Sequence, residues 1–210
     1  YVHAAQDPVS NGWVIMSEER GRFAQAGQPV SATRQPRDHC PFCEGREAMT
    51  PPEIAAYREP GTERNRPGWR VRAIPNQYAA LRIEGEQDRR ADGIYDLMNG
   101  IGAHEVIVET PDHDAHIAEY PAGKTIEVLT MYRDRARDLQ GDQRFRYIQL
   151  FRNHGMSAGA PISHPHSQLI ALPITPRWVK EELVCAKSHW QSKERCLFCD
   201  ILRQEERDGS

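Results

Sequence analysis

The chain has 210 residues, a formal net charge of −3 and a pI of about 6.3. With 39% hydrophobic and 27% charged residues it has the composition of a folded globular domain, and it lacks the basic excess of proteins that bind nucleic acid. Its apolar runs are too short to cross a bilayer and no signal peptide is visible, so we expect a cytoplasmic protein with neither membrane nor nucleic-acid partners.

The first half of the chain predicts short strands separated by loops. Residues 12–17 predict a strand, and residues 24–50 are rich in loop-forming residues. Residues 51–59 predict a short helix, because proline is favoured at the first helical position. Residues 69–85 alternate in polarity and predict two strands broken at Pro75 and Asn76.

The second half alternates strands with helices. A strand is predicted over 104–110, and a long helix over 123–139 with Thr125 as its cap. The apolar stripe predicted for this helix consists of Ile126, Leu129, Tyr132, Ala136 and Leu139. Further strands are predicted over 144–153 and 167–173, and helical segments over 176–190 and 196–207. Four or five strands with one long helix predict an α+β fold with an antiparallel sheet.

The five cysteines include two C-x-x-C pairs, Cys40 with Cys43 and Cys196 with Cys199. An odd total and two tight pairs argue against a secreted disulfide framework. Each pair could be a redox dithiol or half of a zinc site. Redox pairs usually open a helix after a strand, whereas the first pair lies in a loop rich in proline and glycine, which favours zinc.

The segment 153–173 carries two histidines around one proline. In a strand, His164 and His166 would project from the same side, and Pro165 between them stiffens the backbone. Gly155 and Gly159 upstream can let backbone amides approach an anion. Because neutral imidazole is both a nucleophile toward phosphorus and a zinc ligand, this stretch predicts phosphoryl chemistry or metal binding.

At these residues the chain resembles a known family. The stretches DPVSNGWVIMSEERGR, CPFCEG, WRVRAIPNQYAAL and SHPHSQ, in this order along the chain, resemble the galactose-1-phosphate uridylyltransferase family, the transferase branch of the histidine triad superfamily. The resemblance runs from Asp7 to about Glu182. The hydrolase branch carries a third histidine where this chain has Gln168, and the transferase branch carries the glutamine. The resemblance implies a histidine-triad-like antiparallel sheet with one long packed helix and a zinc-bearing loop.

The resemblance also implies an activity and its residues. His166 matches the nucleophile that takes a nucleoside monophosphate as a covalent phosphoramidate, with its second ring nitrogen held by a backbone carbonyl. Asn153, Gly159 and Gln168 match phosphate contacts, Arg20 a phosphate-side arginine and Asn76 a nucleoside-side contact. The implied reaction moves UMP from UDP-glucose to a hexose 1-phosphate such as galactose 1-phosphate. Two departures are Pro161, where many relatives have serine, and Phe23, where arginine is frequent.

A structural zinc site follows from the same comparison. Cys40 and Cys43 match the first two ligands, His113 the third and His164 the fourth, a set that would tie one histidine to a metal beside the nucleophile. His104 and His116 are alternative third ligands. A possible second metal would involve Cys196 and Cys199, as in plant ADP-glucose phosphorylase, or Glu182, which matches a metal-binding carboxylate of some relatives.

The family is built from two tandem modules and its active site borrows residues from a partner subunit, so we expect a homodimer. Residues 1–182 would form the N-terminal module, and residues 183–210 a linker or the start of a second module, apparently truncated. Two alternatives to uridylyl transfer stay open. One is an adenine-specific reaction, as in an ADP-sugar or diadenosine polyphosphate phosphorylase; the other is a non-catalytic module that binds zinc or nucleotide.

Overall fold

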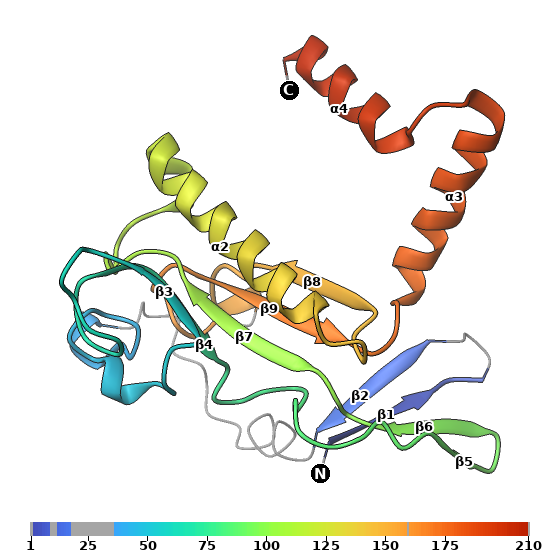
Figure 1. Cartoon of the computed structure of the whole chain (residues 1–210), viewed down its shortest axis with the longest axis horizontal. Helices are drawn as coiled ribbons and strands as arrows, with labels where there is room; N and C mark the ends of the chain where they lie inside the picture. The colour runs from blue at the N-terminus through green and yellow to red at the C-terminus, as the bar shows by residue number, and fades with distance from the viewer. Residues whose placement is uncertain (1, 9–11, 18–35, 159, 210) are drawn as a thin grey trace.

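The computed structural model of the protein describes residues 2–8, 12–17, 36–158 and 160–209. Within these residues, nine strands form two antiparallel sheets with the orders β2-β1-β6-β5 and β3-β4-β7-β9-β8 (Figure 1). The strands are β1 Val2–Gln6, β2 Trp13–Ser17, β3 Ala55–Arg58, β4 Trp69–Pro75, β5 Arg90–Asp92, β6 Tyr95–Asn99, β7 Ala103–Val108, β8 Tyr147–Phe151 and β9 His166–Leu172. The helices are α2 Ala122–Gln140, α3 Arg177–Lys193 and α4 Leu197–Asp208, with short 3₁₀ turns η1 Arg37–His39, η2 Glu47–Met49, η3 Ile117–Glu119 and η4 Met156–Ala158.

The five-stranded sheet has two differently covered faces. Helix α2 lies across one face, where Val128, Met131 and Leu139 pack against strand residues such as Ile107 and Leu169 (Figure 1). On the other face Val106 and Val108 pack with Phe42 and Cys40 of the first cysteine loop. Because neighbouring strand residues point to opposite faces, β7 contributes to both cores. This sandwich of helix, sheet and loop confirms the predicted α+β class.

The predicted helix over 51–59 is wrong, because this segment contains strand β3. Ala55 and Tyr57 pack against the core under α2, and Ala56 packs on the opposite face. This period of two is that of a strand. The second strand predicted over 77–85 also does not form. After β4 the chain makes a loop, with only an isolated bridge between Arg82 and Ile101.

The predicted apolar stripe of α2 is only partly right. Its buried residues are Val128, Met131, Arg135 and Leu139, whereas Ile126 is 63% and Leu129 56% exposed. Arg135 can occupy the buried face because its guanidinium makes a two-pronged ion pair with Glu105 of β7, at 2.7 and 2.8 Å. The helix begins at Ala122, one residue before the predicted range, and its N-cap is Pro121 rather than Thr125.

The second sheet was not predicted beyond strand β2. Its central strand β1 pairs with β2 and β6, and β5 pairs with β6 through a tight turn. Strand β1 has the sequence VHAAQ, whose alanines give little strand signal. The two residues between β5 and β6 are Gly93 and Ile94, and Gly93 has a φ of 59°, which suits glycine at the first turn position of a hairpin.

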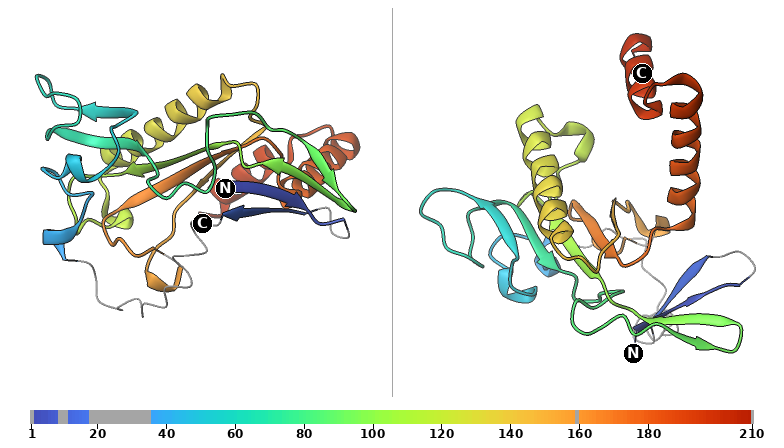
Figure 2. Two further views of the ribbon diagram at one scale, coloured as in Figure 1. Left: turned by 90° about the horizontal axis from the view of Figure 1, so that it is seen from below. Right: turned by 45° about the vertical axis from the view of Figure 1, so that its right-hand side comes forward.

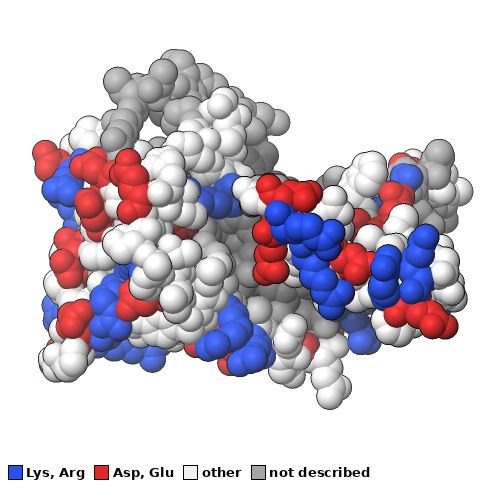
Figure 3. Space-filling model, turned by 90° about the horizontal axis from the view of Figure 1, so that it is seen from above, with Lys and Arg blue, Asp and Glu red and all other residues white. Residues whose placement is uncertain are grey.

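The predicted C-terminal helices are confirmed as α3 and α4, which stand away from the five-stranded sheet (Figure 2). The module boundary expected after residue 182 falls inside α3 and stays a prediction. Seen from above, lysine and arginine side chains mix with aspartate and glutamate, without a single-sign field on that face (Figure 3). Among the described residues, no helix combines the length and apolarity needed to span a bilayer.

Candidate active site and metal centre

His166 is the first residue of β9 and lies on the face of the sheet opposite α2. Its Nδ1 lies 2.8 Å from the backbone carbonyl of His164. Because a carbonyl only accepts, Nδ1 carries the ring proton and Nε2 keeps its lone pair. Burial lowers the pKa of His166, which keeps the imidazole neutral. The predicted carbonyl hold is therefore present, and the free nitrogen is the one suited to nucleophilic attack.

His164 precedes β9 and faces the first cysteine loop, where the Phe42 ring lies beside both histidines. Its Nε2 lies 2.7 Å from the carbonyl of Thr110, so that nitrogen carries the proton and Nδ1 faces Cys43 Sγ at 3.6 Å. Burial, followed by the charge of neighbouring His113, lowers the pKa of His164 to about 4. The two histidines around Pro165 thus present different nitrogens to different sites.

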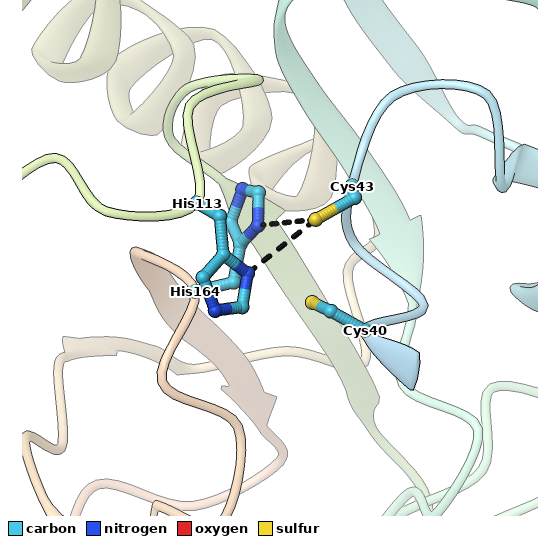
Figure 4. Close-up of side chains that lie close together, drawn as sticks. All are labelled: Cys40, Cys43, His113 and His164. Atoms are coloured by element: carbon cyan, nitrogen blue, oxygen red, sulfur yellow. Dashed lines mark hydrogen bonds between the residues drawn. The ribbon is translucent and has the colours of Figure 1, made fainter. Parts of the chain in front are cut away.

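The ligating atoms of Cys40, Cys43, His113 and His164 all lie within 4.8 Å of one another (Figure 4). His113 Nδ1 lies 3.4 Å from Cys43 Sγ, and its Nε2 lies 3.2 Å from Ser163 Oγ. Tetrahedral zinc bonds imply a sulfur–nitrogen separation of about 3.5 Å. In both imidazoles Nε2 is hydrogen-bonded to a neighbouring oxygen, which leaves Nδ1 available as a ligand. The four side chains, which we call the Cys2His2 cluster, could hold one metal ion.

Three chain segments meet to form the Cys2His2 cluster. The cysteines come from the turn after η1, His113 from the loop after β7, and His164 from the segment before β9 (Figure 4). Cys40 is fully buried, and burial raises the pKa of its thiol to about 11 in the metal-free protein. Such a thiol needs a cation to become a thiolate.

The alternative third ligands lie elsewhere. His104 faces Asn76 and Gln168, and His116 makes an edge-on ring contact with His154, with centroids 5.5 Å apart. His116 also accepts a hydrogen bond from the amide of Ala118 at the start of η3. Of the three predicted candidates, His113 is the one that joins the cysteines.

A pocket of about 400 Å³ opens directly over His166 and Gln168. Phe42 forms part of its wall, with its ring centroid 5.2 Å from that of His166. The remaining wall is mostly apolar with a few polar groups, as expected of a small-molecule site. Other residues lining it include Met49, Thr50, Pro51, Ile74, Asn76, Tyr78, Val106, Ala160, Pro161 and Ile162.

The wall around Thr50 is held by a buried arginine. Arg72 donates from Nη1 to Thr50 Oγ1 at 2.8 Å and from Nε to Glu53 at 3.1 Å. Glu53 also pairs with Arg58 at 2.6 Å. Burial by itself would raise the pKa of the Glu53 carboxyl, but hydrogen bonds from the side chain of Arg58 and from the backbone of Asn65 lower it overall. This ion network joins the pocket wall to strand β4.

A hydrogen-bond cluster lies at one end of the pocket. His104 Nε2 is 2.8 Å from Gln168 Oε1, and Asn76 Nδ2 is 3.3 Å from the same oxygen. Gln168 lies two residues after His166 on the same face of β9, and its predicted phosphate contact stays a prediction. The nucleoside contact of Asn76 stays a prediction. Sequence reasoning considered His104 only as a metal ligand, and its place in the apolar strand was the available signal.

The remaining residues of the predicted site are not brought to this pocket within the described part of the chain. Asn153 follows β8 and is half-buried, but it is not among the described residues that line the pocket. Arg20 and Gly159 lie outside the described residues, so their predicted phosphate contacts stay predictions, and Phe23, the departure from the family pattern, lies outside them too. Glu182 is an exposed residue of α3 and belongs to no metal-binding group within the described part of the chain.

The second cysteine pair is exposed at the start of α4. Cys196 is the N-cap of this helix and Cys199 lies in its first turn. Nearby, His189 of α3 pairs with Asp200 at 3.1 Å. Within the described residues, these side chains do not make up a group of three or more potential ligands. The second metal site is thus incomplete here.

An unpredicted buried carboxylate lies under the other face of β9. Glu109 is fully buried and accepts hydrogen bonds from Ser167 and from Tyr120, the latter at 2.9 Å. It also lies 3.2 Å from Tyr132 Oη and 3.3 Å from Arg152 Nε. Burial raises the pKa of Tyr132 to about 12, so the tyrosine remains a donor. This network fixes the strand that carries His166.

Comparison with known proteins agrees with this geometry. The chain is 33% identical to the ADP-glucose phosphorylase of Arabidopsis thaliana over 93% of its length, and 26% identical to a Thermotoga maritima galactose-1-phosphate uridylyltransferase over 95%. In each case it spans 55% of the relative, about half its length. The crystal structure of the Arabidopsis ADP-glucose phosphorylase with bound ADP-glucose superposes with a TM-score of 0.67 and 32% identity, over 95% of this chain and 58% of that one.

The family assignment rests on the whole N-terminal region rather than on a single motif. The family model described as galactose-1-phosphate uridyl transferase, N-terminal domain, matches residues 2–176. This range contains the Cys2His2 cluster, His166 and Gln168, together with both sheets. The chain therefore belongs to the galactose-1-phosphate uridyl transferase family.

Proposed function

We propose that the protein transfers a nucleoside monophosphate between a nucleotide sugar and a phosphate-bearing acceptor through a covalent bond to His166. The observation that carries the proposal is the orientation of His166. Its Nδ1 is held by the His164 carbonyl, which leaves the lone pair on Nε2, and His166 lines the pocket. The family membership of the chain supports a reaction of this class.

The proposed reaction has two balanced steps. First, the lone pair of His166 Nε2 attacks the α-phosphorus of the nucleotide sugar, and the bond from that phosphorus to the bridging oxygen breaks. The sugar 1-phosphate leaves with the bridging oxygen and the nucleotide stays on nitrogen. Second, an oxygen of the acceptor phosphate attacks the same phosphorus and the phosphorus–nitrogen bond breaks, which regenerates His166.

The Cys2His2 cluster would hold a structural zinc ion. Two thiolates and two imidazoles make a complete tetrahedral set without an open position, so the ion would supply rigidity rather than a reactive water. Its ligand His164 provides the carbonyl that holds His166 Nδ1. The metal would thereby fix the backbone that sets the tautomer of the nucleophile.

The donor base separates two candidate reactions. Uridylyl transfer from UDP-glucose to galactose 1-phosphate is the reaction that the family name suggests. An adenine donor is favoured by a specific observation, the higher identity to ADP-glucose phosphorylase, 33% against 26%. The apolar pocket walls at Phe42, Ile74 and Ile162 would accept either base. We expect a homodimer, as in the family at large.

Intact mass of the protein after incubation with single nucleotide sugars tests the proposal. UDP-glucose or ADP-glucose should add one nucleoside monophosphate, and the mass identifies the base. The adduct should disappear on addition of a sugar 1-phosphate or of inorganic phosphate, which identifies the acceptor. His166→Ala should abolish the adduct, whereas His116→Ala should retain it. Absence of an adduct with either donor contradicts covalent transfer, and an adduct that persists in His166→Ala contradicts the assigned nucleophile.

A further inference from the structure

Strands β4, β7 and β9 place their pocket-facing residues in rows. Ile74, Val106 and Gln168 are paired across the three strands and form one row. In the next row Asn76, just after β4, donates its amide to the carbonyl of His104 at 2.8 Å, and His104 pairs with Ile170. Gln168 is therefore the diagonal neighbour of His104, within reach of its ring.

The backbone fixes which nitrogen of His104 carries the proton. The amide N–H of Ala80 donates to His104 Nδ1 at 3.0 Å. A nitrogen that accepts a hydrogen bond has no proton of its own, so the neutral ring carries its proton on Nε2. His104 Nε2 lies 2.8 Å from Gln168 Oε1, and it must be the donor in that contact.

Asn76 is oriented in a similar way by the same loop. Its Oδ1 accepts the amide N–H of Tyr78 at 2.9 Å, which turns Nδ2 toward Gln168. Nδ2 lies 3.3 Å from Gln168 Oε1, and also 3.0 Å from His104 Nε2. Since both of these nitrogens are donors, the hydrogen bond of Asn76 is directed at the glutamine oxygen. Two donors thus converge on Gln168 Oε1.

This convergence decides how the glutamine amide is turned. A side-chain amide has an acceptor oxygen and a donor nitrogen that exchange places when the group rotates by half a turn. Within the described residues, both contacts of the Gln168 side chain end on Oε1. Rotation would place its NH2 group against two other donors, which is unfavourable. Gln168 Nε2 is therefore the atom available to the pocket.

We propose that His104 is a positioning residue, which holds the oxygen of Gln168 so that the amide nitrogen faces the phosphate transferred to His166. The inference rests on the proposed function, because it concerns donors to the phosphoryl oxygens of that reaction. Negative charge spreads over these oxygens in the transition state, and a donor fixed beforehand needs no reorganisation. His104 touches neither nucleotide nor phosphate in this scheme and acts through Gln168.

A double-mutant cycle tests this coupling in the purified protein. The variants are His104→Phe, which keeps an aromatic ring but lacks hydrogen bonds, Gln168→Ala, and the combination of both. We measure the single-turnover rate of His166 adduct formation at saturating donor, the nucleotide Kd and the melting temperature. His104→Phe should slow adduct formation by about 10- to 100-fold and change the Kd by less than about threefold. In the Gln168→Ala background it should add less than about twofold.

Two further variants separate positioning from folding. His104→Gln can place an amide donor near the former Nε2, so it should regain part of the rate lost in His104→Phe. Ile107→Val, on the same strand but facing α2, removes a buried methylene and should leave the rate within about twofold. Equal slowing by His104→Phe with and without Gln168 would overturn the proposal, as would an unchanged rate in a folded His104→Phe.

Histidine ¹⁵N NMR of the wild-type protein gives a readout that does not depend on turnover. The spectrum should place the proton of His104 on Nε2, and a proton on Nδ1 would overturn the inference. A wild-type protein that forms no adduct while His104 shows the expected tautomer would contradict the proposed function alone. Normal adduct formation with the opposite tautomer would contradict the positioning role alone.

Discussion

Cys40 and Cys43 lie in a loop packed against the sheet, whereas Cys196 and Cys199 lie at the exposed start of α4. Both pairs have the same spacing. The first pair meets two imidazoles whose protons are held by the Thr110 carbonyl and the Ser163 hydroxyl. Near the second pair, the imidazole of His189 is paired with Asp200.

The difference shows that a C-x-x-C spacing supplies only two donors. The remaining ligands of the first pair come from positions 70 and 121 residues beyond Cys43 and are assembled by the antiparallel sheet. Burial of the loop adds a cost that only a bound cation removes, because Cys40 is a buried thiol whose pKa is raised to about 11. Cys196 and Cys199 are exposed to solvent, so their ionisation does not require a bound cation.

The largest expected effect comes from removing one ligand of the Cys2His2 cluster. Structural zinc contributes about 10–16 kcal/mol of apparent binding free energy in small zinc-finger peptides. This protein has additional cores, so we expect Cys43→Ser to lose the metal and to lower the melting temperature by about 10 °C or more. Cys199→Ser is the matched control and should stay within about 1 °C. Equal losses in the two variants, measured by calorimetry, would contradict the assigned difference.

The sequence alone indicated that the first cysteine pair binds a metal, because the motif CPFCEG is followed by the motif SHPHSQ, as in the family that the chain resembles. The local pattern left three histidines as possible third ligands, and the resemblance selected His113. What separates them physically is the path of the loop after β7, which brings His113 to Cys43 and leaves His104 in the sheet. That choice depends on the register of β7, which local patterns do not specify.

The fold was predictable where the hydrophobic period of a segment and its length indicate the same kind of element, as for α2 and β9. It was not predictable where tertiary contacts override local preference. Arg135 occupies a core position of α2 because Glu105 neutralises it across the interface, a pairing that the sequence of the helix alone does not contain. The hydrogen-bonding role of His104 likewise depends on Ala80, on a different segment.

The second largest effect is on metal content. Elemental analysis of the purified protein should give about one zinc per chain, as expected for a single complete tetrahedral site. Cys43→Ser should reduce this value to near zero, and Cys196→Ser combined with Cys199→Ser should leave it unchanged. Two zinc ions per chain, falling to one in the latter variant, would show that residues outside the described part complete the second pair.

Low pH should reduce the stability of the metal-free protein through His164, a member of the Cys2His2 cluster. Burial holds the pKa of His164 at about 4, below its usual value of about 6.5. Between these values the unfolded chain binds a proton that the folded chain does not, so stability falls as pH falls from about 6.5 to about 4. The loss attributable to this residue is at most about 3 kcal/mol. Urea unfolding of wild type and His164→Gln measures it, and identical pH slopes would contradict the assignment.

The smallest effect concerns thiol reactivity at the second pair. The backbone amide and then the thiol of Cys199 lower the pKa of Cys196, which is the N-cap of α4, while Cys196 raises the pKa of Cys199. A thiolate reacts faster with alkylating reagents than a thiol, and helix N-termini favour the thiolate. At pH 7 we therefore expect Cys196 to be labelled ahead of Cys199 and Cys185, with Cys40 protected.

Peptide mass mapping of a time course with iodoacetamide measures this order. Cys199→Ser should slow labelling of Cys196 by about two- to fivefold, because a hydroxyl replaces the thiol while the helix amides remain. Cys185→Ser is the control, since this exposed thiol lies in the middle of α3, away from a helix end. Protection of Cys196 to the same degree as Cys40 would mean that the second pair is occupied by a metal or covered by another part of the protein, and the contrast between the two pairs would then fail.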